Sequence, residues 1–125
     1  MRSNRDHSRL RYIDASNVLC RAGGMADVDL LGVGDEKLGH LNGVLIDPVA
    51  GKLQFYVVDS PGWLNRRQYL LPIEMPARVD PDGRSLHVEI EPGCMEDCET
   101  FERASVPPYS AEDAVHHMFR QEARP

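Results

Sequence analysis

LGHLNGVLIDPVAGKLQFYVV, residues 38–58, predicts two apolar strands joined by a polar turn. The first strand is expected over residues 38–46 and the second over residues 53–58. Pro48 has the fixed φ that suits the second position of a turn, and Gly51 can take a positive φ where the turn ends. Four of the six residues from Leu53 to Val58 are β-branched or aromatic, which favours a strand over a helix.

Length and composition indicate one domain with an aliphatic core. The chain has 125 residues, of which 42% are hydrophobic and 6% aromatic. No apolar run approaches the ~20 residues of a membrane span, and the basic N-terminus is not followed by the apolar segment of a secretory signal. We therefore expect a cytoplasmic protein, and its three cysteines fit a reducing compartment.

Charge is distributed unevenly along the chain. The net charge of −6 argues against nonspecific binding of nucleic acid over the whole surface. Residues 1–21 carry five arginines against two aspartates, whereas residues 85–113 carry eight acidic side chains against one arginine. These two ends are expected either to pair, within one protomer or between two, or to remain two solvated ends.

The segments around the central hairpin divide the chain into three parts. We expect an N-terminal arm over residues 1–26, a β domain over residues 27–91, and an acidic segment with a helix over residues 92–125. The helix is expected to begin at the N-cap Ser110 and to reach about Arg120.

Four further strands are predicted within the β domain. They cover residues 27–33, 69–73, 77–79 and 85–91, and the last alternates with Leu86, Val88 and Ile90 facing inward. Gly39 and Gly43 suit a strand that bends sharply or meets another backbone closely.

Four segments in this order resemble the PRC-barrel family. They are EKLGHLNGVLID at residues 36–47, Leu53–Val58, Tyr69–Pro72 and Leu86–Val88, and the likeness covers about half of the chain, from Asp27 to Glu91. The chain is identified as a stand-alone bacterial member, similar to the cytoplasmic part of the photosynthetic reaction centre H subunit and the C-terminal domain of a ribosome maturation factor.

The resemblance implies a mainly β fold, a small, bent, antiparallel β-barrel of about six strands, with a short C-terminal α-helix added here. Members mostly serve as assembly or binding modules, and no shared catalytic residues come with the family. The chain departs from the family at Asn42-Gly43, where an acidic residue often precedes the Val-Leu run, and at Gly34-Asp35, which replaces the common Asp-Gly turn.

Residues with metal-binding or catalytic chemistry do not form a recognisable pattern. Cys94 and Cys98 make one CxxxC pair without the second pair that zinc needs. The neighbours His116 and His117 would point about 100° apart on a helix. Ser60 lacks the Gly-x-Ser-x-Gly turn of a hydrolase nucleophile. The sequence thus predicts no catalytic residues, no metal site and no cofactor, although His40 and His87 could meet from separate strands.

Trp63, Arg66 and Arg67 are the candidate partner-binding residues. They share a loop after the second strand, and tryptophan beside arginine is typical of an interface hot spot or of a surface that stacks on nucleic-acid bases. The alternative is that Trp63 folds back and caps one end of the barrel.

These features favour a non-enzymatic binding or assembly module, with a homodimer expected because a small open barrel leaves strand edges unpaired. An unidentified protein partner is expected. One alternative is a ribosome- or RNA-associated factor, supported by the basic arm and by Arg66-Arg67. A second alternative is an enzyme or small-molecule-binding protein.

Overall fold

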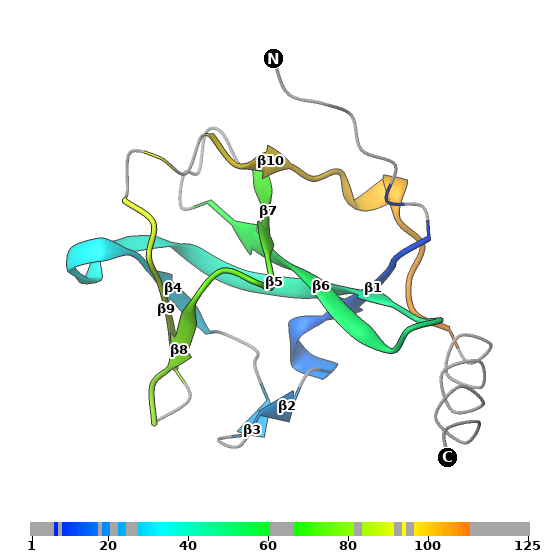
Figure 1. Ribbon diagram of the computed structural model, residues 1–125, viewed down its shortest axis with the longest axis horizontal. Helices are drawn as coiled ribbons and strands as arrows, with labels where there is room; N and C mark the ends of the chain where they lie inside the picture. The colour runs from blue at the N-terminus through cyan, green and yellow to red at the C-terminus, as the bar shows by residue number, and fades with distance from the viewer. Residues whose placement is uncertain are drawn as a thin grey trace.

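The computed structural model describes residues 7, 9–17, 19–20, 23–24, 28–60, 67–81, 84–91, 94 and 97–110 (Figure 1). These residues form strands and short 3-10 turns. The strands are β1 (Arg11–Asp14), β2 (Leu19–Cys20), β3 (Gly23–Gly24), β4 (Asp29–Leu31), β5 (Lys37–Asp47), β6 (Lys52–Asp59), β7 (Gln68–Pro72), β8 (Ala77–Val79), β9 (Ser85–Val88) and β10 (Glu99–Thr100). The 3-10 turns are η1 (Ala15–Asn17), η2 (Val33–Asp35) and η4 (Arg103–Ser105).

The strands form one large sheet and one small one. The large sheet has eight strands in the order β10-β7-β6-β5-β4-β9-β8, with β1 paired to β5 beside this path, and β2 pairs with β3 separately. The expected antiparallel barrel of about six strands is therefore wrong in three respects. The sheet has eight strands, its terminal strands β10 and β8 are not paired to each other, and β4 runs parallel to β9. The two additional strands, β1 and β10, come from segments that the sequence suggested were outside the β domain.

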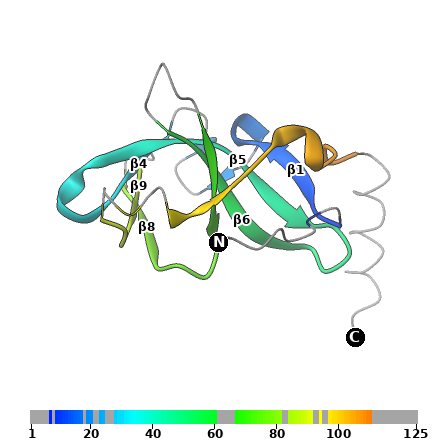
Figure 2. The same cartoon turned by 90° about the horizontal axis from the view of Figure 1, so that it is seen from above.

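The central hairpin is present as predicted, and its first strand, β5, pairs with three other strands (Figure 2). Its first half pairs with β4, its second half with β1, and nearly its whole length with β6. The Asp47 carboxylate accepts hydrogen bonds from the backbone of Val49 and Ala50 in the turn, and Gly51 takes a φ of 67°. A polar turn with one left-handed residue thus sets the register of the two long strands.

An apolar cluster packs on each face of β6. Along β6, Tyr56 and Val58 point into one apolar cluster, and Phe55 and Val57 point into another. The first cluster lies inside the bent sheet and includes Leu30, Leu38, Leu41, Leu71, Leu86, Val88 and Ile90. The second includes Leu10, Tyr12, Leu45, Leu70, Phe101 and Val106. Residues from before and after the β domain therefore cover the outer face.

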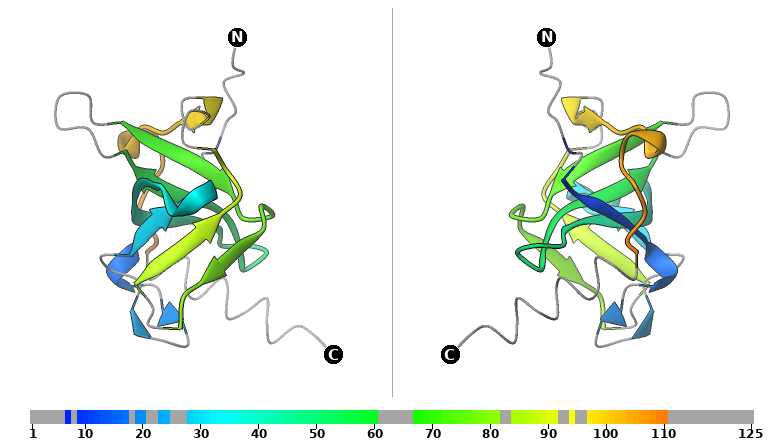
Figure 3. Two further views of the ribbon diagram at one scale, coloured as in Figure 1. Left: turned by 90° about the vertical axis from the view of Figure 1, so that its left-hand side faces the viewer. Right: turned by 90° about the vertical axis from the view of Figure 1, so that its right-hand side faces the viewer.

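The two ends of the described chain lie side by side on that outer face. Figure 3 shows the segment after η4 running along β1, where the Tyr12 N–H donates to Pro107 O over 2.9 Å and the Tyr109 N–H donates to Tyr12 O over 2.9 Å. The Arg103 guanidinium lies 3.9 Å from the centre of the Tyr12 ring. Of the alternatives that the sequence left open, the described parts of the two ends associate within a single chain.

Several strand limits differ from those predicted. The strand expected at residues 27–33 is shortened to β4 because η2 begins at Val33, and the strand expected at residues 85–91 ends at Val88. Gly23-Gly24, within the expected N-terminal arm, forms β3 and pairs with β2. The described residues contain no α-helix, and the helix expected after Ser110 lies beyond them. In the part of the chain that is described, no helix has the length and apolar character needed to cross a bilayer.

Candidate interaction site at the end of β6

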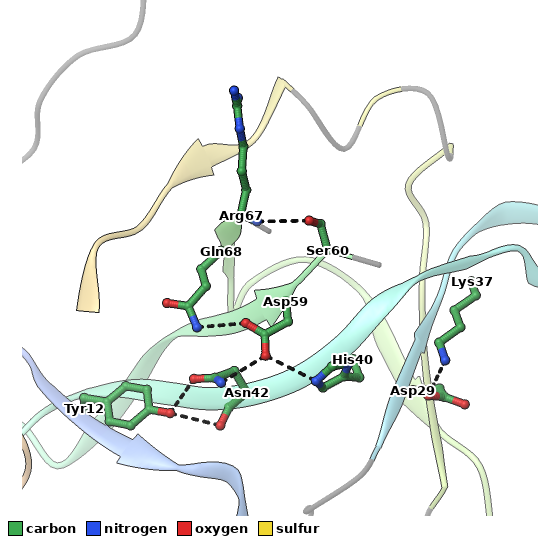
Figure 4. A network of polar contacts seen from close by, with 9 residues as sticks. All are labelled: Tyr12, Asp29, Lys37, His40, Asn42, Asp59, Ser60, Arg67 and Gln68. Atoms are coloured by element: carbon green, nitrogen blue, oxygen red, sulfur yellow. Dashed lines mark hydrogen bonds and ion pairs between the residues drawn. The ribbon is translucent and has the colours of Figure 1, made fainter. Parts of the chain in front are cut away.

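Asp59, the last residue of β6, is the centre of a network of polar side chains (Figure 4). Its Oδ1 accepts a hydrogen bond of 2.8 Å from Gln68 Nε2 on β7, and its Oδ2 accepts one of 3.0 Å from Asn42 Nδ2 on β5. His40 Nε2, also on β5, lies 3.2 Å from the same Oδ2. One carboxylate thus joins the three neighbouring strands β5, β6 and β7 at one end of the sheet.

Asn42 reaches Asp59 because it is the extra residue of a β-bulge. In the pairing with β6, Leu41 lies opposite Val58 and Gly43 lies opposite Val57, so Asn42 has no partner across the ladder. A bulge changes the direction of the extra side chain, which here points along the sheet toward the polar network. The Tyr12 hydroxyl of β1 donates to Asn42 Oδ1 and lies 3.0 Å from Asn42 O.

Gly39 allows β5 and β6 to approach each other beside this network. A Cβ atom at residue 39 would lie 2.0 Å from the carbonyl oxygen of Asp59. No side chain fits at that distance, so glycine is required for this backbone contact. The prediction that Gly39 marks a close approach of two backbones is confirmed.

The two residues that flank the loop after β6 are also fixed to each other. The Ser60 N–H donates to Arg67 O over 2.9 Å, and the Arg67 N–H donates to Ser60 Oγ over 3.2 Å. The Arg67 side chain is exposed, and Figure 4 shows it pointing away from Asp59. Trp63 and Arg66, the other predicted partner-binding residues, lie outside the described residues.

Burial and charge differ across the site. Tyr12 is 7% exposed, and burial, followed by the nearby carboxylate of Asp14, raises the pKa of its hydroxyl to about 12. The His40 side chain, in contrast, is 51% exposed. Lys37 and Asp29 form an ion pair of 3.2 Å on the surface of β4 and β5. The network therefore runs from a neutral buried phenol to an exposed edge with histidine, lysine and arginine side chains.

Both oxygens of Asp59 are occupied by hydrogen-bond donors from within the chain. These bonds tie the end of β6 to β5 on one side and to β7 on the other. The Ser60 hydroxyl accepts from the Arg67 backbone. The site is thus a set of polar contacts that joins three strands next to Ser60 and Arg67.

A second polar cluster holds His87. His87 Nε2 lies 3.1 Å from Asp80 Oδ2, and His87 Nδ1 lies 3.4 Å from Asp35 Oδ1. His40 and His87 therefore belong to different clusters. Cys94 and Cys98 are not disulfide-bonded; Cys94 is exposed and Cys98 is half-buried. Among the described side chains, no three His, Cys, Asp or Glu residues are grouped so that they could hold a metal ion, and His116-His117 lie outside that part of the chain.

Comparison with known proteins identifies the family. The model of the PRC-barrel domain matches residues 29–93, which is just over half of the chain. The chain belongs to the PRC-barrel family. The matched region of this PRC-barrel chain contains His40, Asn42, Asp59 and Gln68, whereas Tyr12 joins the network from outside it.

One relative among curated proteins is an uncharacterized protein of Deinococcus radiodurans. It is 33% identical over 52 residues, which cover 42% of this chain and 19% of that protein. The chain thus matches about a fifth of the length of this relative.

Sequence reasoning placed one described residue, Arg67, in the candidate site and missed the network behind it. Two signals in the sequence pointed to that network. Asn42 stands where the family often has an acidic residue, and Asp59 directly precedes the Ser-Pro-Gly start of the loop. Neither signal indicated that Tyr12, far away in the sequence, would also belong to this network.

Proposed function

We propose that this PRC-barrel chain is a non-enzymatic binding module, working as a homodimer, that contacts a protein partner through Trp63, Arg66 and Arg67. The observation that carries the proposal is the fixation of Asp59 by Gln68 and Asn42, at 2.8 and 3.0 Å, at the end of the strand that leads into this loop. A binding loop on a rigid base loses less conformational entropy when its partner binds.

The loop has the chemistry of a protein interface. Tryptophan and arginine are the residue types most enriched among interface hot spots. Arg67 is exposed, so its guanidinium is accessible to a partner at this end of the sheet. A partner with carboxylate groups around an apolar pocket would be complementary to it.

The occupied oxygens of Asp59 also support a non-enzymatic role. Asn42 and Gln68 both donate to this carboxylate, so its lone pairs hold the strands together. The net charge of −6 favours a protein partner over RNA, because phosphate binding depends on clustered positive charge.

Quantitative capture from an extract of the source cell tests the proposal. The immobilised proteins are the unchanged chain, Trp63→Ala, Arg67→Ala and the control Val49→Ala, which truncates an exposed side chain in the β5–β6 turn. We expect one set of proteins to be lost with Trp63→Ala and with Arg67→Ala and retained with Val49→Ala. Equal retention by all four would contradict the proposal. Loss of the set after nuclease treatment would favour the RNA-associated alternative.

A further inference from the structure

The strand β8 leaves one edge of the large sheet open. β8 is the last strand of the sheet path and pairs on one side with β9 (Figure 1). No described strand pairs with its other side. Ala77, Arg78 and Val79 are all exposed, and Val79 is one of the large apolar side chains that remain accessible. An open edge of this kind can pair with another strand.

The hydrogen-bond pattern shows which backbone groups the open edge presents. The Asp80 N–H donates to Ser85 O over 2.9 Å, and Asp80 lies two residues beyond Arg78, which is paired with His87. In an antiparallel pair the residues that bond to the partner strand alternate with those that do not. Arg78 and Asp80 therefore face β9, and the N–H and C=O groups of Val79 face away from it.

The open edge has a limited length. Pro76 precedes β8 and Pro81 follows Asp80. Proline lacks an N–H, so it stops a ladder from extending in either direction. The edge is thus short enough to resist open-ended aggregation and long enough to pair over a few residues.

We propose that two copies of this chain pair antiparallel through β8, with the two-fold axis at Val79. This deepens the homodimer of the proposed function. The Val79 N–H of each copy would donate to the Val79 C=O of the other. Across the same axis, Arg78 of each copy would lie opposite Asp80 of the other, at the short Cα separation of a non-hydrogen-bonded pair.

Each of the three residues of β8 could lie on the two-fold axis of a symmetric antiparallel pair. The positions of the charged side chains favour the axis at Val79. An axis at Arg78 would place two guanidinium groups directly opposite each other. An axis at Ala77 would place Arg78 opposite Pro76, which has no charge to pair with it. The axis at Val79 alone sets two opposite charges across from each other, twice, around an apolar contact.

Asp80, the acidic residue of the proposed pair, is already held in place by contacts within its own chain. Asp80 Oδ1 lies 3.3 Å from Arg78 Nη1, and Asp80 Oδ2 lies 3.1 Å from His87 Nε2. The side chain of His87 is 17% exposed, so it holds Asp80 from a half-buried position on the next strand. The Arg78 side chain is 68% exposed, so a second copy could approach its guanidinium.

Sedimentation equilibrium of Val79→Lys against Val49→Lys tests the inference. Both changes put a lysine on an exposed valine, 37% and 46% exposed respectively, and only the first puts two like charges at the axis. We expect the unchanged chain and Val49→Lys to have a mass near twice 14.0 kDa, and Val79→Lys to dissociate at least about tenfold more readily.

A second test reverses the charges of Arg78 and Asp80 in separate variants. Arg78→Glu and Asp80→Arg should each weaken self-association, since each opposes like charges across the axis, and an equimolar mixture of the two should restore it. Circular dichroism checks that each variant is folded. A monomeric unchanged chain, a dimeric Val79→Lys or a mixture that fails to associate would overturn the inference. Capture of the protein partner by a folded monomeric variant would show that the binding role stands without it.

Discussion

Asn42 Nδ2 donates to Asp59 Oδ2 over 3.0 Å while its Oδ1 accepts from the hydroxyl of Tyr12. A side chain amide is suited to this position because it donates on one side and accepts on the other. The contact joins β1, β5 and β6, and it does so at the bulge that turns Asn42 out of the regular ladder. Asn42 therefore connects the N-terminal strand to the base of the candidate binding loop.

Asn42→Asp replaces the donor by a second carboxylate next to Asp59. The change removes one hydrogen bond and opposes two negative charges, so we expect a loss of about 2–3 kcal/mol in the free energy of unfolding at neutral pH. The mutual repulsion raises the pKa of the carboxyl pair in the folded state, so stability should recover as the pH falls toward ~4. Urea denaturation at both pH values measures it. Asn17→Asp, the same change at an exposed residue of η1, is the control; equal losses in the two variants would contradict the assigned contact.

Gly39→Ala combines a close approach with a positive φ of 156°, whereas Gly34→Ala introduces only the strain of a positive φ. The new Cβ at residue 39 would meet the Asp59 carbonyl oxygen at 2.0 Å, whereas a Cβ at Gly34 meets nothing within 4 Å and only suffers from a φ of 75°. We expect a cost of at least about 3 kcal/mol at Gly39 and about 1 kcal/mol at Gly34. Thermal unfolding ranks the two. The packing of β5 against β6 would be wrong if Gly34→Ala were the more damaging change.

Phe101→Ala tests whether the segment after β9 is part of the core. Phe101 is 7% exposed and packs in the outer cluster with Leu45 and Val57. Loss of a buried aromatic ring costs about 3–5 kcal/mol, while Val49→Ala at an exposed turn should cost less than about 0.5 kcal/mol. Denaturant unfolding monitored by far-UV circular dichroism gives both values. A small loss for Phe101→Ala would show that the outer face does not depend on this segment.

The raised pKa of Tyr12 predicts that the protein loses stability at alkaline pH. Burial raises the pKa of its hydroxyl in the folded chain from 10.0 to about 12. Because the folded state holds the proton more tightly than the unfolded state, this contribution is complete below pH ~10 and is lost as the pH rises toward ~12. It amounts to roughly 2 kcal/mol. Tyr12→Phe should show a shallower decline between these pH values, and equal slopes for both proteins would contradict the buried environment of the hydroxyl.

Local residue patterns predicted the centre of the fold well. The turn at Asp47 and Gly51, the alternation of β9 and the close approach at Gly39 all follow from backbone preferences of the residues concerned. Each depends on contacts between neighbours in sequence or across one hairpin, and such contacts leave a readable pattern.

The contributions of distant segments could not be predicted in the same way. β1 has only four residues, and it forms a strand because Tyr12 packs against Gly43 and Leu45 across the sheet. The parallel pairing of β4 with β9 joins residues more than fifty positions apart. The role of Asn42 depends on a bulge that exists only once β5 and β6 have paired. Tertiary contacts therefore created the network behind Arg67.

The central claim is that the Asp59 network fixes the base of the loop after β6, and amide hydrogen exchange at Ser60 tests it most directly. The Ser60 N–H donates to Arg67 O, so its exchange rate reports opening of the loop base. We predict that Asn42→Ala speeds this exchange at least about tenfold beyond any change in global stability, since a lost hydrogen bond to a charged carboxylate is worth about 1.5 kcal/mol or more, and that Asn17→Ala does not. An unchanged Ser60 rate in Asn42→Ala would contradict the claim.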